Sequence, residues 1–258
     1  MLFKQVFFLF ICLNIYGVNI DRVILGCDTN AMYLEFWPLV AKTWKEIVGI
    51  KPTVAFIGPK DFPIDETLGD VLRFEPIPTI PTSFQAQVIR LLLPVYFEDE
   101  ICIISDMDMI PLQKDFFTKN VELAPSDSLV IFNNGVTDNK FKEYLMCYIV
   151  AQGKTFKEIF NLSDLSEIPR IIQEWYNLNL GWSTDQQILY EAIENWEHKN
   201  SRVIKLGYKE PRRIDRLNWH YDSELLKQKN FYVDSHMLRP YKNYKLLIDA
   251  LIEYLDLK

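Results

Sequence analysis

Glycine and cysteine are scarce in this sequence. Nine glycines are spread over 258 residues, and the segment GCDTN (26–30), which follows the first hydrophobic run, is not glycine-rich. The glycine-rich phosphate loop expected of a nucleotidyltransferase is therefore missing. The four cysteines, at positions 12, 27, 102 and 147, have no CxxC spacing. The sequence thus predicts neither a zinc cluster nor a disulfide framework, and Cys102, inside a hydrophobic run, is expected to be buried.

The chain also lacks an excess of positive charge. Its formal net charge is −7 and its pI is about 5.1, so nucleic acid is not expected as a partner. The segment KEPRRIDR (209–216) is a local exception. Charge runs of this kind are usually solvated faces.

No hydrophobic run is long enough for an ordinary membrane span, which needs about twenty residues. The apolar stretch at 6–16 is shorter and is followed by Gly17, as in the core and cleavage region of a signal peptide. Residues 1–19 are therefore a candidate signal or membrane anchor, and an extra hydrophobic element or a misassigned start codon is the alternative. Membrane association through this segment and a cytoplasmic location, including that of a virus-infected cell, both stay open.

What the sequence does contain is enough hydrophobic residues, at 49%, for a sizeable core. Residues 20–258 are expected to form one domain. Its first part predicts strands and helices in alternation: a strand followed by a loop over 22–30, helix 32–49 with Pro38 bending it or marking its first turn, strand 51–57, helix 83–93 and strand 101–104. This order favours an α/β fold with a mostly parallel central sheet flanked by helices.

The second part of the chain predicts further elements of both kinds. They are strand 128–135, helices 140–160, 168–177 and 182–196, strands 201–208 and 230–238, and helix 244–255. Ser183 and Gln186 have the spacing of a capping box at the start of the third of these helices.

Polar residues follow the predicted strands of the first part. Asp28 and Gly58 follow the first two strands, and Asp106 and Asp108 follow the third. Ligands of parallel sheets bind at this edge. The two aspartates fit three uses: to hold Mg²⁺ or Mn²⁺ against a diphosphate, to form an aspartyl nucleophile for phosphoryl transfer, or to be solvated loop residues.

Four segments in this order carry a resemblance to a known family. The segments SFQAQVIRLLLP, ISDMDMIPL, WSTDQQ and DSHMLRPYKNYK resemble those of the small DxD glycosyltransferases of large algal viruses and their bacterial relatives, over about residues 20–248. The resemblance implies a GT-A fold and a hexosyl- or deoxyhexosyltransferase that depends on Mn²⁺ or Mg²⁺. The implied partners are a nucleotide-sugar donor, usually a UDP-sugar, and a glycan or other hydroxyl acceptor.

The resemblance also implies roles for individual residues. Metal ligands would be Asp106, which alternatively binds ribose, together with Asp108 and His236. Six residues would bind the nucleotide-sugar donor. Asp28, Thr29 and Asn30 follow the first strand, Gly58 follows the second, Arg90 lies in the helix before the DxD motif, and Lys242 lies six residues after His236. In this sequence Arg239 stands where glycogenin-like members usually have glycine, which makes the assignment of Lys242 less secure.

The acceptor side is expected near the start of helix 182–196. Asp185 would act there as base or would orient the acceptor hydroxyl, with its pKa lowered by the helix dipole; the alternative is a plain helix-capping role. Trp182 is a candidate to stack on an acceptor sugar, whereas Trp37, Trp44 and Trp175 are expected in the core. Among the basic residues, Arg212, Arg213 and Arg216 are candidates to flank the diphosphate.

Two other functions are consistent with parts of the pattern. A haloacid-dehalogenase-type phosphatase also has an apolar strand followed by DxD, but that motif normally lies near the N-terminus and is followed by Thr or Val. Here it begins at position 106 and Met109 follows. A catalytically degenerate sugar-nucleotide-binding protein is the non-enzymatic alternative.

Overall fold

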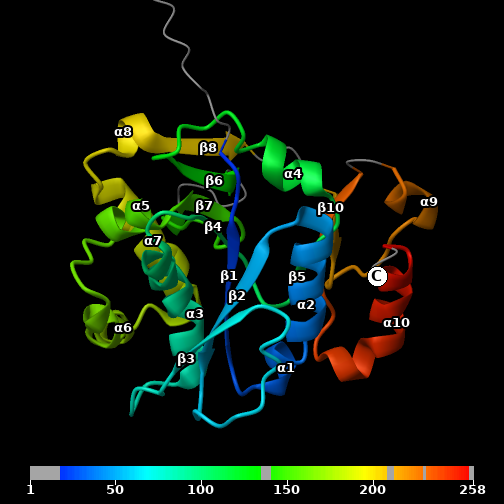
Figure 1. The fold of residues 1–258 in the computed structure, drawn as a ribbon, viewed down its shortest axis with the longest axis horizontal. Coiled ribbons are helices and arrows are strands. Elements are labelled where there is room, and N and C mark those ends of the chain that lie inside the picture. Colours follow the sequence, from blue (N-terminus) through cyan, green and yellow to red (C-terminus); the bar gives the residue numbers. More distant parts are fainter. Residues whose placement is uncertain (1–17, 135–140, 208–211, 229–230, 256–258) are drawn as a thin grey trace, which may run out of the picture.

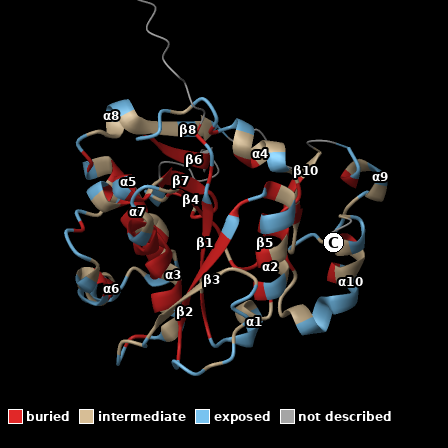
Figure 2. Ribbon diagram, in the orientation of Figure 1, coloured by how far each residue is buried: buried red, intermediate tan, exposed pale blue. Residues whose placement is uncertain are grey.

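The structure is a computed structural model, and it describes residues 18–134, 141–207, 212–228 and 231–255. The expected alternation of strands and helices is present in its first part. The elements there are β1 (Arg22–Asp28), α1 (Ala31–Leu34), α2 (Trp37–Thr43), β2 (Lys51–Ile57), β3 (Asp70–Phe74), α3 (Thr82–Leu92) and β4 (Ile101–Ile104). Because β1, β2 and β4 are buried along nearly their whole length, they lie in the interior of the sheet (Figure 2).

The central sheet has seven strands in the order β3-β2-β1-β4-β7-β6-β8. Its last three strands are β7 (Ile149–Gln152), β6 (Leu129–Asn134) and β8 (Val203–Gly207). Only β7 runs antiparallel to its neighbours, so the sheet is mostly parallel, as predicted. The carboxyl ends of β1 and β4 therefore lie side by side, which brings Asp28 close to the segment that contains Asp106 and Asp108.

A small second sheet extends from that edge. It contains β5 (Met109–Pro111), β10 (Tyr232–His236) and β9 (Arg212–Asp215) in the order β5-β10-β9. In the antiparallel pairing of β10 with β5, His236 is the partner of Met109. This register places a residue near the end of the chain directly beside Asp108.

Helices cover both faces of the central sheet (Figure 1). On one face lie α3, α5 (Gly153–Ile159), α6 (Ile168–Asn177) and α7 (Thr184–Asn195), and on the other lie α2, α4 (Lys114–Lys119) and α10 (Tyr241–Glu253). Two short helices follow later in the chain: α8 (Lys199–Arg202) lies between α7 and β8, and α9 (Ser223–Leu226) lies between β9 and β10. The hydrophobic core is accordingly divided into two clusters, one on each side of the sheet.

The helix predicted over 32–49 is divided into three pieces. Pro38 lies in the first turn of α2, where its missing N–H is not needed, so the expectation that it marks the real first turn is confirmed. A π-helical turn at Trp44–Val48 follows and ends at Gly49, whose φ of 88° is a left-handed conformation that glycine adopts without strain. Trp37 and Trp44 are buried, as expected.

The helix predicted over 140–160 is wrong in its middle. Residues Ile149–Gln152 form β7, which pairs with β4 and β6, and only Gly153–Ile159 is helical. A short apolar run that contains Ile149 and Val150 fits a buried strand and a buried helix equally well by periodicity. This run forms a strand because it pairs with β4 on one side and β6 on the other.

The predicted capping box is also wrong, although the helix it was to start is present. Ser183 lies in a short 3₁₀ turn before α7 and its side chain makes no capping hydrogen bond; its Oγ instead accepts a hydrogen bond from Gln187 at 2.9 Å. Asp185 accepts a hydrogen bond from the backbone N–H of Gln186 at 2.9 Å. The polar start of α7 therefore depends on Asp185 and Gln187.

Most of the candidate signal or anchor segment, residues 1–17, lies outside the described part of the chain. Val18 and Ile20 are buried in the core, and the N–H of Val18 donates to the carbonyl of Glu122 at 3.2 Å. Val18 is therefore already part of the described core, two residues before the expected start of the domain at residue 20. Among the described helices, none combines the length and the apolar character that a membrane span requires.

Candidate functional site

A cavity of about 560 Å³ lies at the carboxyl ends of β1 and β4. Segments far apart in the sequence line it, namely the loop after β1, helix α3, the segment between β4 and β5, the start of α7 and the ends of β9 and β10. Its charged lining residues are Asp28, Asp106, Asp108 and Asp185 together with Arg90, Arg213, Arg216, Arg239 and His236. Four carboxylates and four guanidinium groups therefore line one cavity. In such a cluster the pKa values of the side chains are expected to differ from their ordinary values.

Helix α3 contributes Arg90 because it lies very close to β1. A Cβ atom on Gly26 would lie 2.2 Å from the carbonyl oxygen of Ala86 and 2.8 Å from Cγ of Arg90, so only glycine fits at this position. The arginine that the family resemblance singled out is thus held against the strand that ends in Asp28.

Arg90 joins the two acidic parts of the site. Its Nη1 forms an ion pair with Asp106, and its Nη2 lies 3.0 Å from Oδ2 of Asp185. Two further bonds, to the carbonyl oxygens of Gln87 and Ser105, fix the guanidinium group. The structure therefore brings the predicted residues Arg90, Asp106 and Asp185 together, with Arg90 between the two carboxylates.

Asp108 is buried and is contacted by three basic side chains. Its Oδ2 lies 2.6 Å from Nη1 of Arg216, 3.2 Å from Nε of Arg239 and 3.3 Å from Nε2 of His236. Burial acts to raise the pKa of Asp108, but His236, Arg239 and Arg216 outweigh it and hold that pKa below its ordinary value. Asp108 is therefore a carboxylate at neutral pH.

Asp108 and His236 have a spacing that suits a shared divalent cation. An octahedral ion about 2.1 Å from each of two adjacent ligands holds those ligands about 3 Å apart, close to the 3.3 Å measured here. The other ring nitrogen of His236, Nδ1, lies 3.6 Å from Asp215, an arrangement that orients Nε2 toward Asp108. Among the described residues, no group of three or more His, Cys, Asp and Glu side chains is placed to hold a metal. These two residues fit an ion that takes its remaining ligands from phosphate and water.

Asp185 differs electrostatically from the sequence-based expectation. Burial raises its pKa to about 6, against a lowering by Arg90, so the expected lowering by the helix dipole is wrong. Its Oδ1 accepts hydrogen bonds from Gln87 and from the backbone N–H of Gln186, both at 2.9 Å. Its hydrogen-bond partners Gln87, Arg90 and the N–H of Gln186 are donors, so these bonds are strongest when Asp185 is ionised, although nearby Asp106 also acts to raise its pKa.

The residues after β1 are divided between the cavity and its surroundings. Asp28 is buried and accepts hydrogen bonds from Thr82 at 2.8 Å and from the N–H of Asn30 at 3.0 Å, and Asn30 caps α1. Both residues line the cavity, whereas Thr29 and Gly58 are not among its lining residues. The nucleotide-binding roles of these four residues stay predictions.

Lys242, the predicted diphosphate-binding lysine, does not line the cavity, whereas Arg239, to which the resemblance assigns no role, does. Lys242 is exposed in the first turn of α10, and its backbone N–H donates to Glu35 at 3.2 Å, outside the cavity lining. Arg239 lines the cavity with its guanidinium 4.9 Å above the ring of Tyr33. The sequence contained the signal for Arg239, since it is the one basic residue between His236 and Lys242.

The three arginines of the basic segment also take different positions. Arg213 and Arg216 line the cavity, and Arg213 makes a buried ion pair with Asp234 at 2.6 Å. Tyr148 donates to the same carboxylate at 2.8 Å. Arg212 lies in β9, and its side chain is outside the described part of the structure. Arg213 donates to both oxygens of Asp234, whereas Arg216 donates to Asp108 through Nη1 alone, so Arg216 is the better candidate of the two to contact a ligand.

One tryptophan stands at the mouth of the cavity. Trp182 is 73% exposed, and its carbonyl oxygen accepts a hydrogen bond from Gln87, which also binds Asp185. An exposed indole ring beside polar groups is a suitable platform for a sugar ring. Trp175 packs at the edge of the core, as expected.

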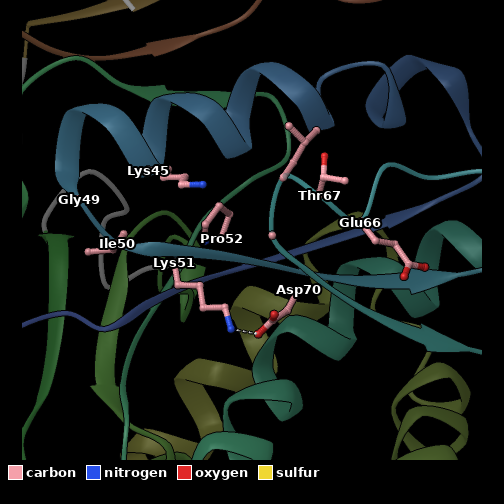
Figure 3. A pocket seen from close by; sticks show the side chains of 10 residues that line it. Lys45, Gly49, Ile50, Lys51, Pro52, Glu66, Thr67 and Asp70 are labelled. Carbon is pink, nitrogen blue, oxygen red and sulfur yellow. Dashed lines mark ion pairs between the residues drawn. The ribbon is translucent and has the colours of Figure 1, made fainter. Parts of the chain in front are cut away.

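A second cavity, of about 480 Å³, lies at the opposite edge of the sheet, where β2 and β3 begin (Figure 3). Lys51 and Asp70 form an ion pair of 2.8 Å across it. Asp70 also pairs with Arg22 at 2.5 Å, and Arg22 pairs with Glu100 at 2.7 Å. None of the residues predicted to bind donor, metal or acceptor lines this second cavity.

Comparisons with known proteins support the fold of the chain. No protein-family model matches the sequence, and no curated protein sequence matches it significantly. Among solved structures, the galactosyltransferase LgtC in complex with donor and acceptor sugar analogues matches with a TM-score of 0.51 and 14% identity, over 91% of this chain and 95% of that one. The glycosyltransferase GlyE of Streptococcus pneumoniae TIGR4 matches with a TM-score of 0.51 and 15% identity, over 93% of this chain.

The chain spans 62% of the length of GlyE and nearly all of LgtC. At these identities the similarity concerns the fold. The predicted α/β architecture of GT-A type, a mostly parallel sheet between two layers of helices, is therefore confirmed.

Proposed function

We propose that this protein is a metal-dependent glycosyltransferase that moves a hexosyl or deoxyhexosyl group from a UDP-sugar to a hydroxyl group of a glycan or other acceptor. The observation that carries the proposal is the meeting of Asp108 and His236, 3.3 Å apart, in a charged cavity at the carboxyl edge of a glycosyltransferase fold. LgtC, which shares this fold, was crystallised with donor and acceptor sugar analogues.

The reaction needs charge compensation where the diphosphate leaves. When the sugar–phosphate bond breaks, negative charge develops on the leaving diphosphate, and the acceptor hydroxyl loses its proton as the new glycosidic bond forms. Bound Mn²⁺ or Mg²⁺ supplies Lewis-acid stabilisation of that charge. Asp108 and His236 are the residues that would hold the ion, and imidazole together with carboxylate suits Mn²⁺ better than Mg²⁺.

The other residues divide into a donor side and an acceptor side. Asp28 and Asn30, after β1, line the part of the cavity proposed for the nucleotide. Asp106 is held by Arg90, so it is placed to accept a ribose hydroxyl or to join the metal after exchange of that pair. On the acceptor side, ionised Asp185 orients Arg90 and Gln87, next to the exposed ring of Trp182.

The phosphatase alternative makes a different prediction for the same residues. A phosphatase of the haloacid-dehalogenase type would use one aspartate as a nucleophile toward a phosphomonoester. The fold supports sugar transfer instead, because LgtC and GlyE, two solved structures that match the chain, are glycosyltransferases.

The test is release of UDP from a panel of UDP-sugars with Mn²⁺, Mg²⁺ or EDTA, with and without glycan acceptors. Asp108→Ala should lower metal-stimulated turnover by about 10³-fold, because the leaving group loses its electrostatic stabilisation. Asp65→Ala is the control and should turn over normally, because Asp65 is an exposed carboxylate that is not among the residues lining the cavity. Full activity of folded Asp108→Ala would contradict the proposal, hydrolysis of p-nitrophenyl phosphate would favour a phosphatase, and binding without turnover would favour a degenerate protein.

A further inference from the structure

One oxygen atom of Asp108 has more positive partners than it can satisfy equally. Arg216, Arg239 and His236 all contact Oδ2, at 2.6, 3.2 and 3.3 Å, and the side chain of Asp108 is only 4% exposed. Asp215 is a second carboxylate nearby, but it faces Nδ1 of the imidazole at 3.6 Å. The two guanidinium groups therefore share the single carboxylate of Asp108, so together they are open to a further anion.

Both arginines keep donor groups that face the cavity. Arg216 and Arg239 line it, with side chains 27% and 20% exposed. Arg239 is held independently of Asp108, because its Nη1 donates to the hydroxyl of Tyr33 and its guanidinium lies over the same ring. Within the part of the chain that the structure describes, Nη2 of neither arginine has a hydrogen-bond partner.

A cation and a diphosphate would rearrange these contacts in a predictable way. A divalent cation on Asp108 and His236 competes with Arg216 and Arg239 for the same carboxylate oxygen. A diphosphate offers the arginines several oxygens with suitable geometry, because guanidinium groups bind phosphate through parallel N–H donors. When the cation binds Asp108 and the diphosphate binds Arg216 and Arg239, the carboxylate and both guanidinium groups each have a partner of opposite charge.

We propose that Arg216 and Arg239 are the diphosphate ligands of this site, and that Asp108 holds them in place until a cation takes over its carboxylate. The inference rests on the proposed use of a diphosphate-bearing donor. If Asp108 only bound the metal, diphosphate would not be expected to bind without a metal. We expect instead that the two arginines bind diphosphate in the absence of metal and that the negative charge of Asp108 weakens this binding.

The test is calorimetric titration of inorganic pyrophosphate into the full chain in EDTA, so that neither a metal nor a nucleotide contributes. Arg216→Gln and Arg239→Gln should each weaken pyrophosphate binding about tenfold, the usual effect of losing a charged hydrogen bond. Asp108→Asn should tighten it by at least about threefold, because one negative charge next to the anion is removed. Arg73→Gln is the matched control and should bind normally, since Arg73 is similarly exposed at 25% and pairs with Glu66 outside the cavity.

Thermal melting of each variant establishes that it is folded before titration. Unchanged affinity in Arg216→Gln and Arg239→Gln would overturn the assignment of the ligands. Weaker binding in folded Asp108→Asn would overturn the exchange of partners. If the protein transfers sugar with Mn²⁺ but shows neither effect in EDTA, this inference is refuted and the proposed function stands. If pyrophosphate binding changes as expected in the variants but no sugar is transferred, the proposed function is refuted and the assignment of the arginines stands.

Discussion

Two buried arginines, Arg22 and Arg90, lie at opposite edges of the same sheet, and each is placed between two carboxylates. They are 4% and 6% exposed. Arg22, at the start of β1, binds Asp70, Glu100 and the hydroxyl of Thr53, and it stacks 3.7 Å above the ring of Phe97. Arg90, near the end of β1, binds Asp106 and Asp185.

The carboxylates differ more than the arginines do. Asp70 and Glu100 are 35% and 37% exposed, so water shares their charge, whereas Asp185 is 2% exposed and next to a cavity that other charges line. At the amino edge, burial acts to raise the pKa of Asp70, but Lys51 and Arg22 outweigh it and hold that pKa below its ordinary value. At the carboxyl edge, burial of Asp185 prevails over Arg90 and raises the pKa of that carboxyl group to about 6, beside the cavity that holds the candidate site. The same residue types thus stabilise the fold at one edge and form the candidate site at the other.

The largest expected effect is on stability, at the amino edge. Arg22→Ala leaves Asp70, Glu100 and Thr53 without their shared donor and removes the contact with Phe97. We expect a loss of about 3 kcal/mol in the free energy of unfolding, measured by urea denaturation, because several charge-assisted hydrogen bonds and the cation–π contact are lost together and the buried hydroxyl of Thr53 loses its donor. Lys51→Met removes the exposed cation from the same Asp70 (Figure 3) and should cost less than about 0.5 kcal/mol. Equal losses in the free energy of unfolding of the two variants would show that the buried arginine contributes no more than the exposed lysine.

The corresponding change at the carboxyl edge should affect turnover. Arg90→Gln removes the group that orients Asp106 and Asp185, so sugar transfer should fall about 30-fold, or about 2 kcal/mol in transition-state stabilisation. Arg202→Gln is the matched control, because Arg202 is a largely buried arginine that pairs with Asp127 and Glu158 outside the cavity. If Arg22→Ala lowered the turnover of the folded protein as much as Arg90→Gln, the division between the edges would be wrong.

The central sheet and most of the cavity could be predicted from the sequence, because both depend on local patterns. Alternating strands and helices define a mostly parallel sheet, and polar residues after β1 and β4 must then meet at one edge. β7 was missed since its four apolar residues have no distinctive period, and only pairing with β4 and β6 makes them a strand.

The late part of the site was harder to predict because it depends on pairing between distant strands. That His236 lies beside Asp108 follows from the register of β10 on β5, and that Arg239 instead of Lys242 enters the cavity follows from where α10 begins. Spacing from His236 alone does not contain this information. The raised pKa of Asp185 was missed for a similar reason, since burial by the rest of the chain outweighs the local helix dipole.

The pH dependence of sugar transfer tests the role of Asp185 at the carboxyl edge. Below the pKa of Asp185, the rate of sugar transfer should change about tenfold per pH unit. Because burial raises the pKa of Asp185 from 3.8 to about 6, against Arg90 and together with Asp106, its ionised form is lost as pH falls through 6. Sugar transfer should therefore rise with pH up to about 6 and then level off. The effect on stability has the opposite sign: the folded protein binds the extra proton between pH 3.8 and about 6, so this group's contribution to stability declines as pH rises through that window.

Asp185→Asn separates this carboxyl from the others near it. The variant should lose most of its turnover, and its stability should no longer show the decline between pH 3.8 and about 6. A stability profile in Asp185→Asn that still matches the wild type would assign the titration to another group.

The smallest expected effect is that of removing residues 1–17, most of the segment 1–19 that we propose to be a signal or anchor outside the α/β domain. Deletion of 1–17 should change the free energy of unfolding by less than about 0.5 kcal/mol and leave turnover unchanged, since the core residues that the structure describes all lie at Val18 or later. Deletion of 1–20 is the informative partner: it also removes the buried side chains of Val18 and Ile20 and the hydrogen bond from Val18 to Glu122. That deletion should cost about 3 kcal/mol, roughly the value of burying two aliphatic side chains, in the same urea denaturation. Unfolding of the 1–17 deletion would show that the hydrophobic segment belongs to the core. Equal stability of the two deletions would show that Val18 and Ile20 do not anchor the amino edge.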